Sequence, residues 1–455
     1  MPQFAANSWE ARSDAHVLYG FTDLPTIRER GPIVLTHGTG IHVHDVHGRS
    51  WLDANSGLWN MVAGFDHPGI AAAAKAQYDR FPGYHAFFGR LSDQTVALSE
   101  KLIEVSPFET GKVFLTNSGS EANDTMVKML WFINTVMGRP EKRKIITREN
   151  GYHGVTVASA SMTGKPYNAW FGLPLPEFLH TSCPHHWRHG AEGESERAYS
   201  ARLASELEAL IAREGPETIA GFVAEPVMGA GGVIVPPEGY FQAIQPVLKR
   251  HGIPLISDEV ICGFGRTGPV WGCEGFGFQP DAIISSKNLT AGYFPMGAII
   301  LGQELAAALD DASAEIDEFV HGFTASGHPV GCAVALKAID VILNEGLIDN
   351  LRAVAPLFQE RLRAMADLPH IGEARGVGLM GALEAVADKD AKTPFASELS
   401  VSERIATACI DNGLICRPLG QAIVLCPPFI ITPAEIDRLF DLLEQSLASV
   451  FREIG

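Results

Sequence analysis

The sequence predicts an α/β protein, with a large domain built on a mostly parallel β-sheet and a smaller α+β domain. Short apolar runs alternate with helical stretches between about residues 110 and 305, which is typical of a sheet covered by helices. Most of these runs are β-branched and apolar on both faces, as expected for strands buried on both sides. After residue 329 the alternation gives way to long amphipathic segments and isolated strand-like pieces.

The strands of the large sheet are predicted at six runs, namely 112–116, 144–147, 219–224, 254–257, 281–285 and 297–301. A helix with a buried stripe is predicted through Leu203, Leu207, Leu210 and Ile211. The smaller domain is predicted to hold helices over 329–344, 347–366 and 433–451, with strands at 376–380 and 423–426. We therefore expect a large domain over 66–328 and a C-terminal small domain over 329–455, which residues 1–65 join through a strand at 41–46.

The composition excludes several classes of function. The chain has 35 basic and 53 acidic residues and a net charge of −18, so it should repel nucleic acid and anionic membranes. No basic segment followed by an apolar run opens the chain, and no stretch reaches the roughly 18 apolar residues of a membrane span. The seven cysteines form no Cys-x-x-Cys pair, which indicates free thiols and a protein of the cytoplasm. The same spacing argues against a zinc site. The histidine-rich segment 183–186 is more simply interpreted as a packing cluster than as a metal site.

An anion-binding helix start is predicted at Thr116-Asn-Ser-Gly-Ser-Glu-Ala-Asn123. Ser118 and Glu121 have the spacing of a capping box, so a helix should begin between them. Gly119 lets a ligand approach the backbone, Ser120 adds a hydroxyl, and free N–H groups at a helix start attract phosphate. An ordinary capped helix without a ligand fits these residues equally well.

Two carboxylates and one tyrosine stand where strands end. Glu225 and Asp258 follow apolar runs, and ligand sites of open α/β sheets lie at the carboxyl ends of the strands. A structural ion pair is the alternative, since a carboxylate buried there needs a partner. Tyr152 lies between two glycines in Gly151-Tyr-His-Gly154 and could lie flat on a ring, or simply occupy a turn.

Lys287 gives the clearest indication of a reactive residue, because it directly follows the apolar run 281–286. A lysine at such a strand end is partly desolvated, which lowers its pKa and frees its amine to attack a carbonyl. A lysine whose charged end reaches back to water is the plainer alternative. Pyridoxal phosphate (PLP) requires a lysine, a carboxylate for its ring nitrogen, an anion site and a stacking face, and the residues above offer all four.

The sequence resembles the class III aminotransferases of PLP fold type I (aspartate aminotransferase-like) over nearly its whole length, from about Trp9 to Phe451. The matching motifs are Asn117-Ser-Gly-Ser-Glu-Ala, Tyr152-His-Gly, Ala224-Glu-Pro, Ile256-Ser-Asp-Glu-Val, Gly263-Phe-Gly-Arg-Thr-Gly268 and Ser286-Lys-Asn-Leu. The resemblance implies that Lys287 holds PLP covalently, that Asp258 pairs with its ring nitrogen and that Tyr152 stacks on the ring.

The resemblance also implies the rest of the cofactor site. Gly119 and Ser120 would bind the phosphate, Thr324 would reach it from the neighbouring subunit, and Glu225 would lie near the cofactor edge. Members of this fold type usually build the site at a dimer interface, so a homodimer or larger assembly is expected.

Three segments narrow the resemblance to the amine (omega-amino acid):pyruvate transaminase branch. They are Trp59-Asn-Met-Val-Ala-Gly-Phe, Cys416-Arg-Pro-Leu-Gly, and a stretch between Lys287 and Pro295 that is one residue longer than the commoner family form. This branch implies two half-reactions that move an amino group from an amine or omega-amino acid to a keto acid, with pyruvate expected. Its substrate pocket would be lined by Phe21, Trp59, Phe87, Phe88, Tyr152, Ala230, Ile261 and Arg417. Arg417 is expected to be mobile because its segment has a turn-like composition.

Other functions on the same fold stay open from the sequence. A PLP decarboxylase or aminomutase could use the same residues, because these enzymes differ in what the substrate offers above the ring. A non-catalytic PLP-binding protein would need no reactive lysine. Its DNA-binding form carries an additional winged-helix domain, for which this chain has no spare length.

Overall fold

The computed structural model describes residues 4–5 and 7–454, and its centre is a seven-stranded sheet with the strand order β4-β10-β9-β8-β7-β5-β6. The strands are β4 (Gly111–Thr116), β5 (Lys144–Arg148), β6 (Phe178–Thr181), β7 (Ile219–Ala224), β8 (Leu255–Asp258), β9 (Ala282–Ser285) and β10 (Gly297–Gly302). The strands from β6 to β9 pair in parallel, whereas β10 is antiparallel to both of its neighbours. The predicted sheet is confirmed, and β6 is a strand that the sequence analysis did not identify.

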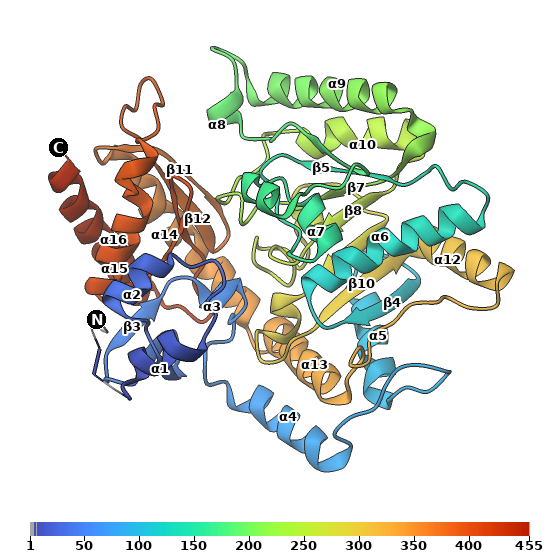
Figure 1. The fold of residues 1–455 in the computed structure, drawn as a ribbon, viewed down its shortest axis with the longest axis horizontal. Helices are drawn as coiled ribbons and strands as arrows, with labels where there is room; N and C mark the ends of the chain where they lie inside the picture. The colour runs from blue at the N-terminus through green and yellow to red at the C-terminus, as the bar shows by residue number, and fades with distance from the viewer. Residues whose placement is uncertain (1–3, 6, 455) are drawn as a thin grey trace.

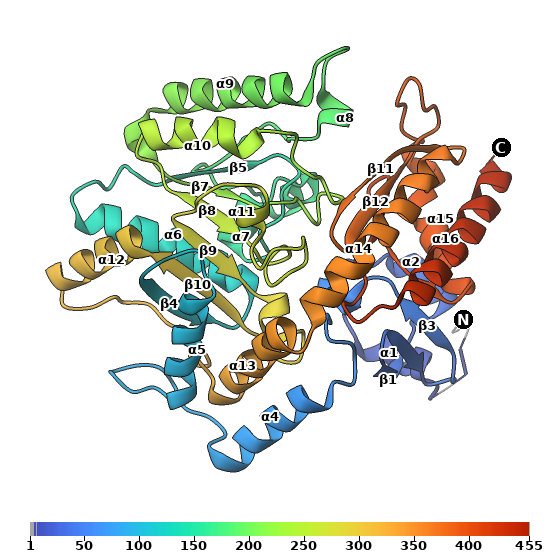
Figure 2. The ribbon, with the colours of Figure 1, turned by 180° about the vertical axis from the view of Figure 1, so that it is seen from behind.

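Alternating side chains of this sheet enter two different cores. On β9, Ile283 contributes to the larger hydrophobic cluster and Ile284 to a second one, and both side chains are buried. Residues one apart on a strand point to opposite faces, so a sheet covered by helices on both sides requires an apolar run without a polar face. Figures 1 and 2 show the covering helices from opposite sides, and they are α5 (Asp93–Glu104), α6 (Gly119–Val136), α7 (Val157–Met162), α9 (Glu196–Glu214), α10 (Tyr240–Arg250) and α12 (Gln303–Glu315).

Two four-stranded sheets lie at the opposite end of the molecule from the seven-stranded sheet. The first joins both ends of the chain, because β3 pairs in parallel with β13. Its strands are β1 (Leu35–Thr39), β2 (His42–Asp45), β3 (Ser50–Asp53) and β13 (Leu414–Ile415). The second is antiparallel and consists of β11 (Ile371–Val377), β12 (Met380–Ala385), β15 (Ala422–Leu425) and β14 (Arg417–Leu419).

Most of the remaining helices pack around these small sheets or connect them to the large one, whereas the short helices at 186–189 and 272–275 follow strands β6 and β8 of the large sheet. Figures 1 and 2 show the helices nearest the two chain ends gathered at one end of the molecule, away from α9 and α12. The helices are α1 (Trp9–His16), α2 (Leu24–Arg30), α3 (Ser56–Trp59), α4 (Pro68–Arg80), α8 (His186–His189), α11 (Gly272–Gly275), α13 (Pro329–Asn344), α14 (Leu347–Ala364), α15 (Val401–Asp411) and α16 (Pro433–Ile454).

Two local predictions for the C-terminal part need correction. The run 376–380, predicted as one strand, contains the end of β11, a turn at Gly378 and Leu379, and the first residue of β12, with Gly378 at φ 57°. A Cβ atom on Gly378 would lie 2.4 Å from the carbonyl oxygen of Arg266, so the turn needs glycine. The segment of Arg417 is a turn only at its end, because Arg417 lies in β14 and pairs with Val424, whereas Gly420 follows that strand with φ 61°.

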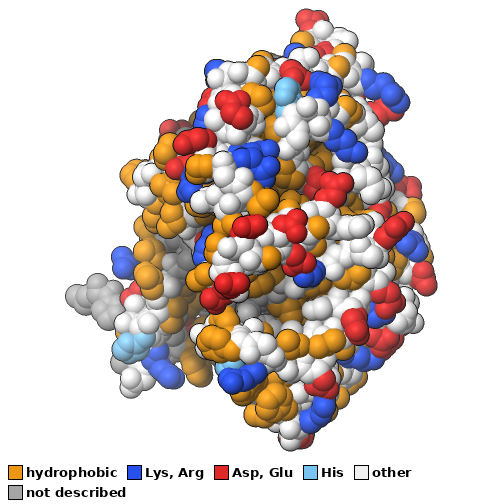
Figure 3. All heavy atoms as spheres, turned by 90° about the vertical axis from the view of Figure 1, so that its right-hand side faces the viewer, with side chains coloured by type: hydrophobic (Ala, Val, Ile, Leu, Met, Phe, Trp, Pro, Cys, Tyr) orange, Lys and Arg blue, Asp and Glu red, His pale blue; other side chains and the backbone are white. Residues whose placement is uncertain are grey.

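The surface carries charges of both signs. Figure 3 shows acidic and basic side chains interspersed on the face that it presents. Among the helices of the described residues, none is long and apolar enough to cross a lipid bilayer.

Candidate active site

The predicted cofactor residues meet at the carboxyl edge of the large sheet. Glu225 directly follows β7, Asp258 ends β8, and Lys287 opens the short 3-10 helix η3 (Lys287–Thr290) just after β9. Gly119 begins α6 right after β4, and the loop with Tyr152 follows β5. These five strands run in the same direction, so their carboxyl ends bring residues far apart in the sequence into one cavity of about 650 Å³.

Lys287 reaches this cavity with a reactive amine. Its pKa is lowered from the usual 10.5 to about 8, mainly by burial and also by the Arg417 charge, although Asp258 and Glu225 raise it. Within the described residues the Lys287 amine makes no hydrogen bond of 3.5 Å or less and no ion pair. Its backbone has φ 44°, a conformation that non-glycine residues rarely adopt outside functional sites. An unpaired amine with a lowered pKa can act as a nucleophile and as a base.

Asp258 is buried and held by three donors. The Nδ2 atom of Asn123 lies 3.0 Å from its Oδ2 atom, His153 Nδ1 lies 2.7 Å from the same oxygen, and the Val260 N–H donates to Oδ1 at 3.2 Å. The carboxylate is thus fixed in orientation. Such a group can hold a proton on a ring nitrogen in the cavity.

The start of α6 offers a site for an anion. Ser118 caps the helix by accepting a hydrogen bond from the Glu121 N–H at 3.1 Å, as its spacing predicted. The Glu121 carboxylate, however, accepts from the N–H of Asn117 at 2.8 Å and not from Ser118. Within the described residues the N–H groups of Gly119 and Ser120 donate no hydrogen bond, so both are free for a phosphate.

Glu225 and Tyr152 lie together beside Lys287. The Glu225 carboxylate accepts from the Tyr152 N–H at 3.1 Å and from the Gly229 N–H at 2.9 Å, and burial raises its pKa. The half-buried Tyr152 also lines the cavity. Glu225 therefore fixes the loop that presents the aromatic ring, and it makes no ion pair of 4 Å or less within the described residues.

The predicted pocket residues fall into two groups. Phe21, Trp59, Ala230, Ile261 and Arg417 line the same cavity as Lys287. Trp59 is held by its Nε1 donating to Asn55 Oδ1 at 2.6 Å. A Cβ atom on Gly229 would lie 2.2 Å from the Trp59 ring, which explains the glycine in that turn.

Phe87, Phe88 and Thr324 do not reach this cavity within one chain. Phe88 is 83% exposed, and Thr324 is exposed as well. Phe87 and Phe88 line a different hollow, together with Gly322 and His321, so they share one surface with the segment of Thr324. A single chain leaves these three predicted residues outside its own site.

Arg417 enters the pocket from the small antiparallel sheet. Its guanidinium lies 5.7 Å from the centroid of the Trp59 ring, and burial lowers its pKa from the usual 12.5. No described carboxylate lies within 4 Å of it. This half-buried cation without a partner is available to a carboxylate of the substrate.

The residues of the site that the sequence analysis missed include His153, Asn123, Lys165 and Tyr167. His153 lies in a quoted motif but was given no role, and Asn123 closes the helix-start motif. Lys165 and Tyr167 also line the cavity, and they lie just after the short helix α7, outside every motif that the sequence analysis named. Only tertiary packing brings them to the site, so no local pattern could have singled them out.

Comparison with known proteins assigns the family. A family model described as aminotransferase class-III matches residues 26–447. The chain is a class-III aminotransferase. This assignment favours amino-group transfer over the decarboxylase, aminomutase and non-catalytic alternatives.

Solved structures similar to this aminotransferase include a PMP-bound aminotransferase from Vibrio fluvialis and an omega-aminotransferase from Paracoccus denitrificans. Both are 68% identical to this chain, with a TM-score of 0.98. Each match covers 100% of the solved chain, and the two matches cover 99% and 98% of this chain, respectively. A curated relative, gamma aminobutyrate transaminase 1 of Solanum lycopersicum, is 43% identical over 93% of this chain and 82% of its own length. The class-III aminotransferase thus has PLP fold type I and uses PLP, for which the cavity offers a free amine, a buried carboxylate and two free N–H groups.

Proposed function

We propose that this aminotransferase moves an amino group from an amine or omega-amino acid to pyruvate. The observation that carries the proposal is Arg417, a cation without a carboxylate partner in the pocket of Lys287. A keto acid places its carboxylate beside the reacting carbon, where a bidentate pair with Arg417 would orient it. The apolar walls formed by Trp59, Ala230 and Ile261 suit the carbon chain of a donor.

The residues around PLP would divide the chemistry between them. When bound, PLP supplies an electron sink for the carbon that loses its proton. Lys287 would hold the cofactor, and its amine, with a pKa of about 8, can accept and return a proton near neutral pH. Asp258 would keep the ring nitrogen protonated, and Tyr152 would cover the ring. Gly119 and Ser120 would bind the phosphate, and Glu225 would hold the loop at the cofactor edge.

The relatives support an omega-type donor. One similar structure is named an omega-aminotransferase, and the curated relative is named a gamma aminobutyrate transaminase. Both names describe an amino group that is not on the α-carbon of an amino acid. A cytoplasmic location belongs to the same proposal, and it is supported by seven cysteines that are all buried and free of disulfides.

We also propose that the working unit is a homodimer with its sites at the interface. Phe87, Phe88 and the segment of Thr324 form one surface outside their own chain's pocket. A second copy would bring Thr324 to the phosphate and the two phenylalanines to the substrate pocket. Exposed aromatic side chains of this kind are enriched in protein interfaces.

One acceptor comparison tests the proposed reaction. The purified enzyme, loaded with PLP, is supplied with 1-phenylethylamine and either pyruvate or acetone, which has the same methyl ketone but no carboxylate. We expect acetophenone to form at least tenfold faster with pyruvate, because Arg417 can pair only with a carboxylate. Equal initial rates with acetone would refute the proposed role of the keto-acid carboxylate.

A further inference from the structure

The pocket holds a second cation, Lys165, to which the reaction above gives no role. Lys165 follows Gly164, whose N–H donates to the Gly151 carbonyl at 3.1 Å and whose carbonyl accepts from the Asn150 N–H at 2.8 Å. A Cβ atom on Gly164 would lie 2.5 Å from the Arg148 carbonyl oxygen. The glycine therefore lets this segment lie against the end of β5, which fixes the backbone of Lys165 beside the cofactor loop.

The Lys165 side chain is held but not neutralised. Its ammonium donates to Asn150 Oδ1, and Asn150 Nδ2 donates to the Gly231 carbonyl at 2.9 Å, so the amide oxygen faces the lysine. No described carboxylate lies within 4 Å of the ammonium. A lysine ammonium has three N–H donors. Only one has a partner here, so two remain for a ligand.

Charges of both signs in the pocket act on Lys165. Burial lowers the pKa of Lys165, Glu225 raises it, and the charge of Arg417 lowers it again. The Glu225 carboxylate is already engaged by two backbone N–H groups. Among the described residues neither Lys165 nor Arg417 has a carboxylate within 4 Å, so an anionic ligand would relieve the repulsion between the two cations.

A neighbouring cavity gives a ligand room beyond Lys165. The active-site cavity and a second one of about 280 Å³ share Asn150, Lys165, Leu419 and Gly420 as walls. Among the lysines and arginines that line the second cavity, Arg375 and Arg188 pair with Glu384 at 2.8 and 3.0 Å. Lys165 is the remaining one, and it alone has no carboxylate partner.

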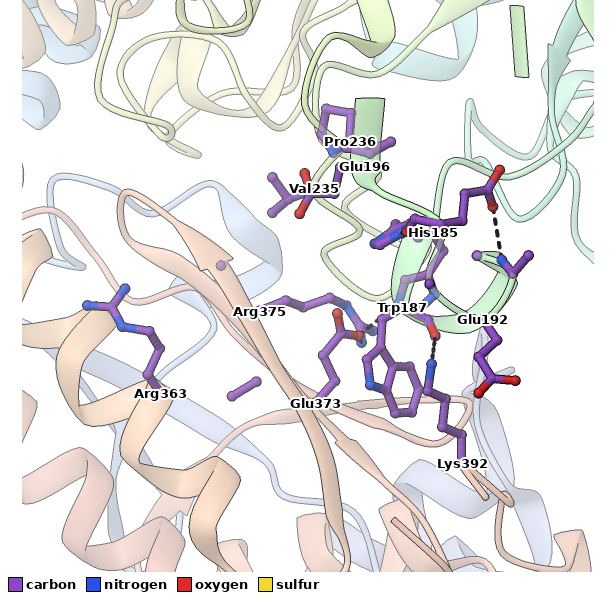
Figure 4. Close-up of a pocket in the computed structure, with 18 of the residues that line it drawn as sticks. His185, Trp187, Glu192, Glu196, Val235, Pro236, Arg363, Glu373, Arg375 and Lys392 are labelled. Carbon is purple, nitrogen blue, oxygen red and sulfur yellow. Dashed lines mark hydrogen bonds and ion pairs between the residues drawn. The ribbon is translucent and has the colours of Figure 1, made fainter. Parts of the chain in front are cut away.

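A third cavity continues along the same seam between the large and small sheets. Figure 4 shows Arg375 and Glu373 on β11 near His185. Glu373 pairs with Arg375 at 2.6 Å and with His185 at 2.8 Å, and Arg375 and His185 line both the second and the third cavity. Because these charges satisfy one another, Lys165 is the cation shared by the active-site cavity and the second cavity that, among the described residues, has no carboxylate within 4 Å.

We propose that Lys165 binds the distal carboxylate of an omega-amino acid donor, separately from the keto-acid carboxylate that Arg417 binds. This inference rests on the proposed function, because it assumes a donor whose amine meets Lys287. A donor carboxylate lies several carbons from the reacting atom, whereas a keto-acid carboxylate lies next to it. Because these two carboxylates lie at different distances from the atom that reacts at Lys287, two cations at different positions can bind them better than one cation.

A matched pair of donors tests the proposal in the holoenzyme. 4-Aminobutyrate and butylamine have the same length and differ in the distal carboxylate. Lys165→Met should raise KM for 4-aminobutyrate about 10- to 100-fold with kcat changed less than threefold, as for the loss of a charge-assisted hydrogen bond. KM for butylamine should change less than threefold. Lys165→Arg should recover most of the loss, and Lys75→Met, a charge loss on the exposed face of α4, should change neither donor.

A binding measurement without turnover separates this proposal from the proposed reaction. Glutarate can engage both Arg417 and Lys165, whereas butyrate can engage only one of them. The wild-type holoenzyme should bind glutarate at least tenfold more tightly than butyrate, and Lys165→Met should abolish that difference. Equal losses for both amines, or an unchanged preference for glutarate in Lys165→Met, would overturn the assignment. If no donor is turned over, the proposed reaction fails, while the glutarate titration still decides the role of Lys165.

Discussion

The Nδ1 atom of His153 lies 2.7 Å from the Oδ2 atom of Asp258, and both side chains are buried. A carboxylate only accepts hydrogen bonds, so an ionised Asp258 requires the proton on Nδ1. The other ring nitrogen, Nε2, is buried and has no partner among the described residues. His153 thus donates one hydrogen bond, to the group that we propose for the ring nitrogen of PLP.

Removing this donor should weaken Asp258 without destroying the site. His153→Ala leaves Asp258 with Asn123 and the Val260 N–H, and a hydrogen bond to a charged group contributes about 1.5–3 kcal/mol. We expect kcat of the donor half-reaction to fall roughly 10- to 150-fold, and the PLP dissociation constant to rise. His153→Asn, which keeps a donor near the Nδ1 position, should recover part of both.

Asp258→Asn sets the scale for this comparison, since it removes the charge itself and should cost more than His153→Ala. His153 could hold Asp258 for the reaction or only support the fold, and the pH profile of the half-reaction separates these two roles. If His153 only supports the fold, His153→Ala lowers the melting temperature and leaves the pH profile and the affinity for PLP unchanged.

Arg417 should serve the acceptor and not an apolar donor. Breaking a buried charge pair costs about 2–5 kcal/mol, so Arg417→Ala should slow the half-reaction with pyruvate about 30- to several-thousand-fold. The half-reaction with 1-phenylethylamine should change less than about tenfold, because that amine has no carboxylate. Since β14 is paired with β15, we expect the side chain, and not the hairpin, to swing. Single-turnover kinetics measure each half-reaction, and equal losses would indicate a structural arginine.

Thr324 should act on the site of the other subunit. Thr324→Glu would repel the cofactor phosphate, and Lys287→Ala would lack the amine, so each homodimer should be inactive. Mixing the two variants under subunit exchange should restore activity, because one of the two sites then combines an intact Lys287 with an intact Thr324.

A matched control tests the geometry of this exchange. Wild-type subunits are mixed with a double variant that carries both Lys287→Ala and Thr324→Glu. The mixed dimers then contain the same substitutions as before, but the intact Lys287 always faces a partner with the Thr324→Glu substitution. No mixed dimer should therefore be active. Activity in these dimers, or a fully active monomer in sedimentation, would contradict the shared site.

The sequence predicted the edge of the sheet that carries the site, because apolar runs ending at Glu225, Asp258 and Lys287 define where parallel strands stop. It could not predict the partners of Asp258, since Asn123 and His153 lie 135 and 105 residues away from it. The antiparallel direction of β10 was equally hidden, because an apolar run has no direction. The turn signal of the Arg417 segment holds at Gly420, whereas Arg417 itself lies in a strand because it pairs with Val424 across the hairpin.

The lowered pKa of Lys287 predicts the pH dependence of cofactor attachment to the apoenzyme. Only the neutral amine attacks, so the rate should rise with pH and level off above about 8, where an ordinary lysine is roughly 0.3% neutral. Arg417→Ala removes a charge that lowers this pKa and should move the midpoint up, whereas Glu225→Gln removes one that raises it and should move the midpoint down. Stopped-flow absorbance after mixing with PLP gives the midpoint, and one near 10.5 would contradict a desolvated amine.

Chemical labelling of the holoenzyme tests most directly whether Lys287 is the residue that carries PLP. Borohydride fixes PLP irreversibly on the lysine that holds it, and peptide mapping by mass spectrometry then identifies that lysine. We predict one label per chain, on Lys287, and an inactive Lys287→Ala variant that takes no label. A label on Lys165, the other lysine of the cavity, or full activity of Lys287→Ala would contradict the account.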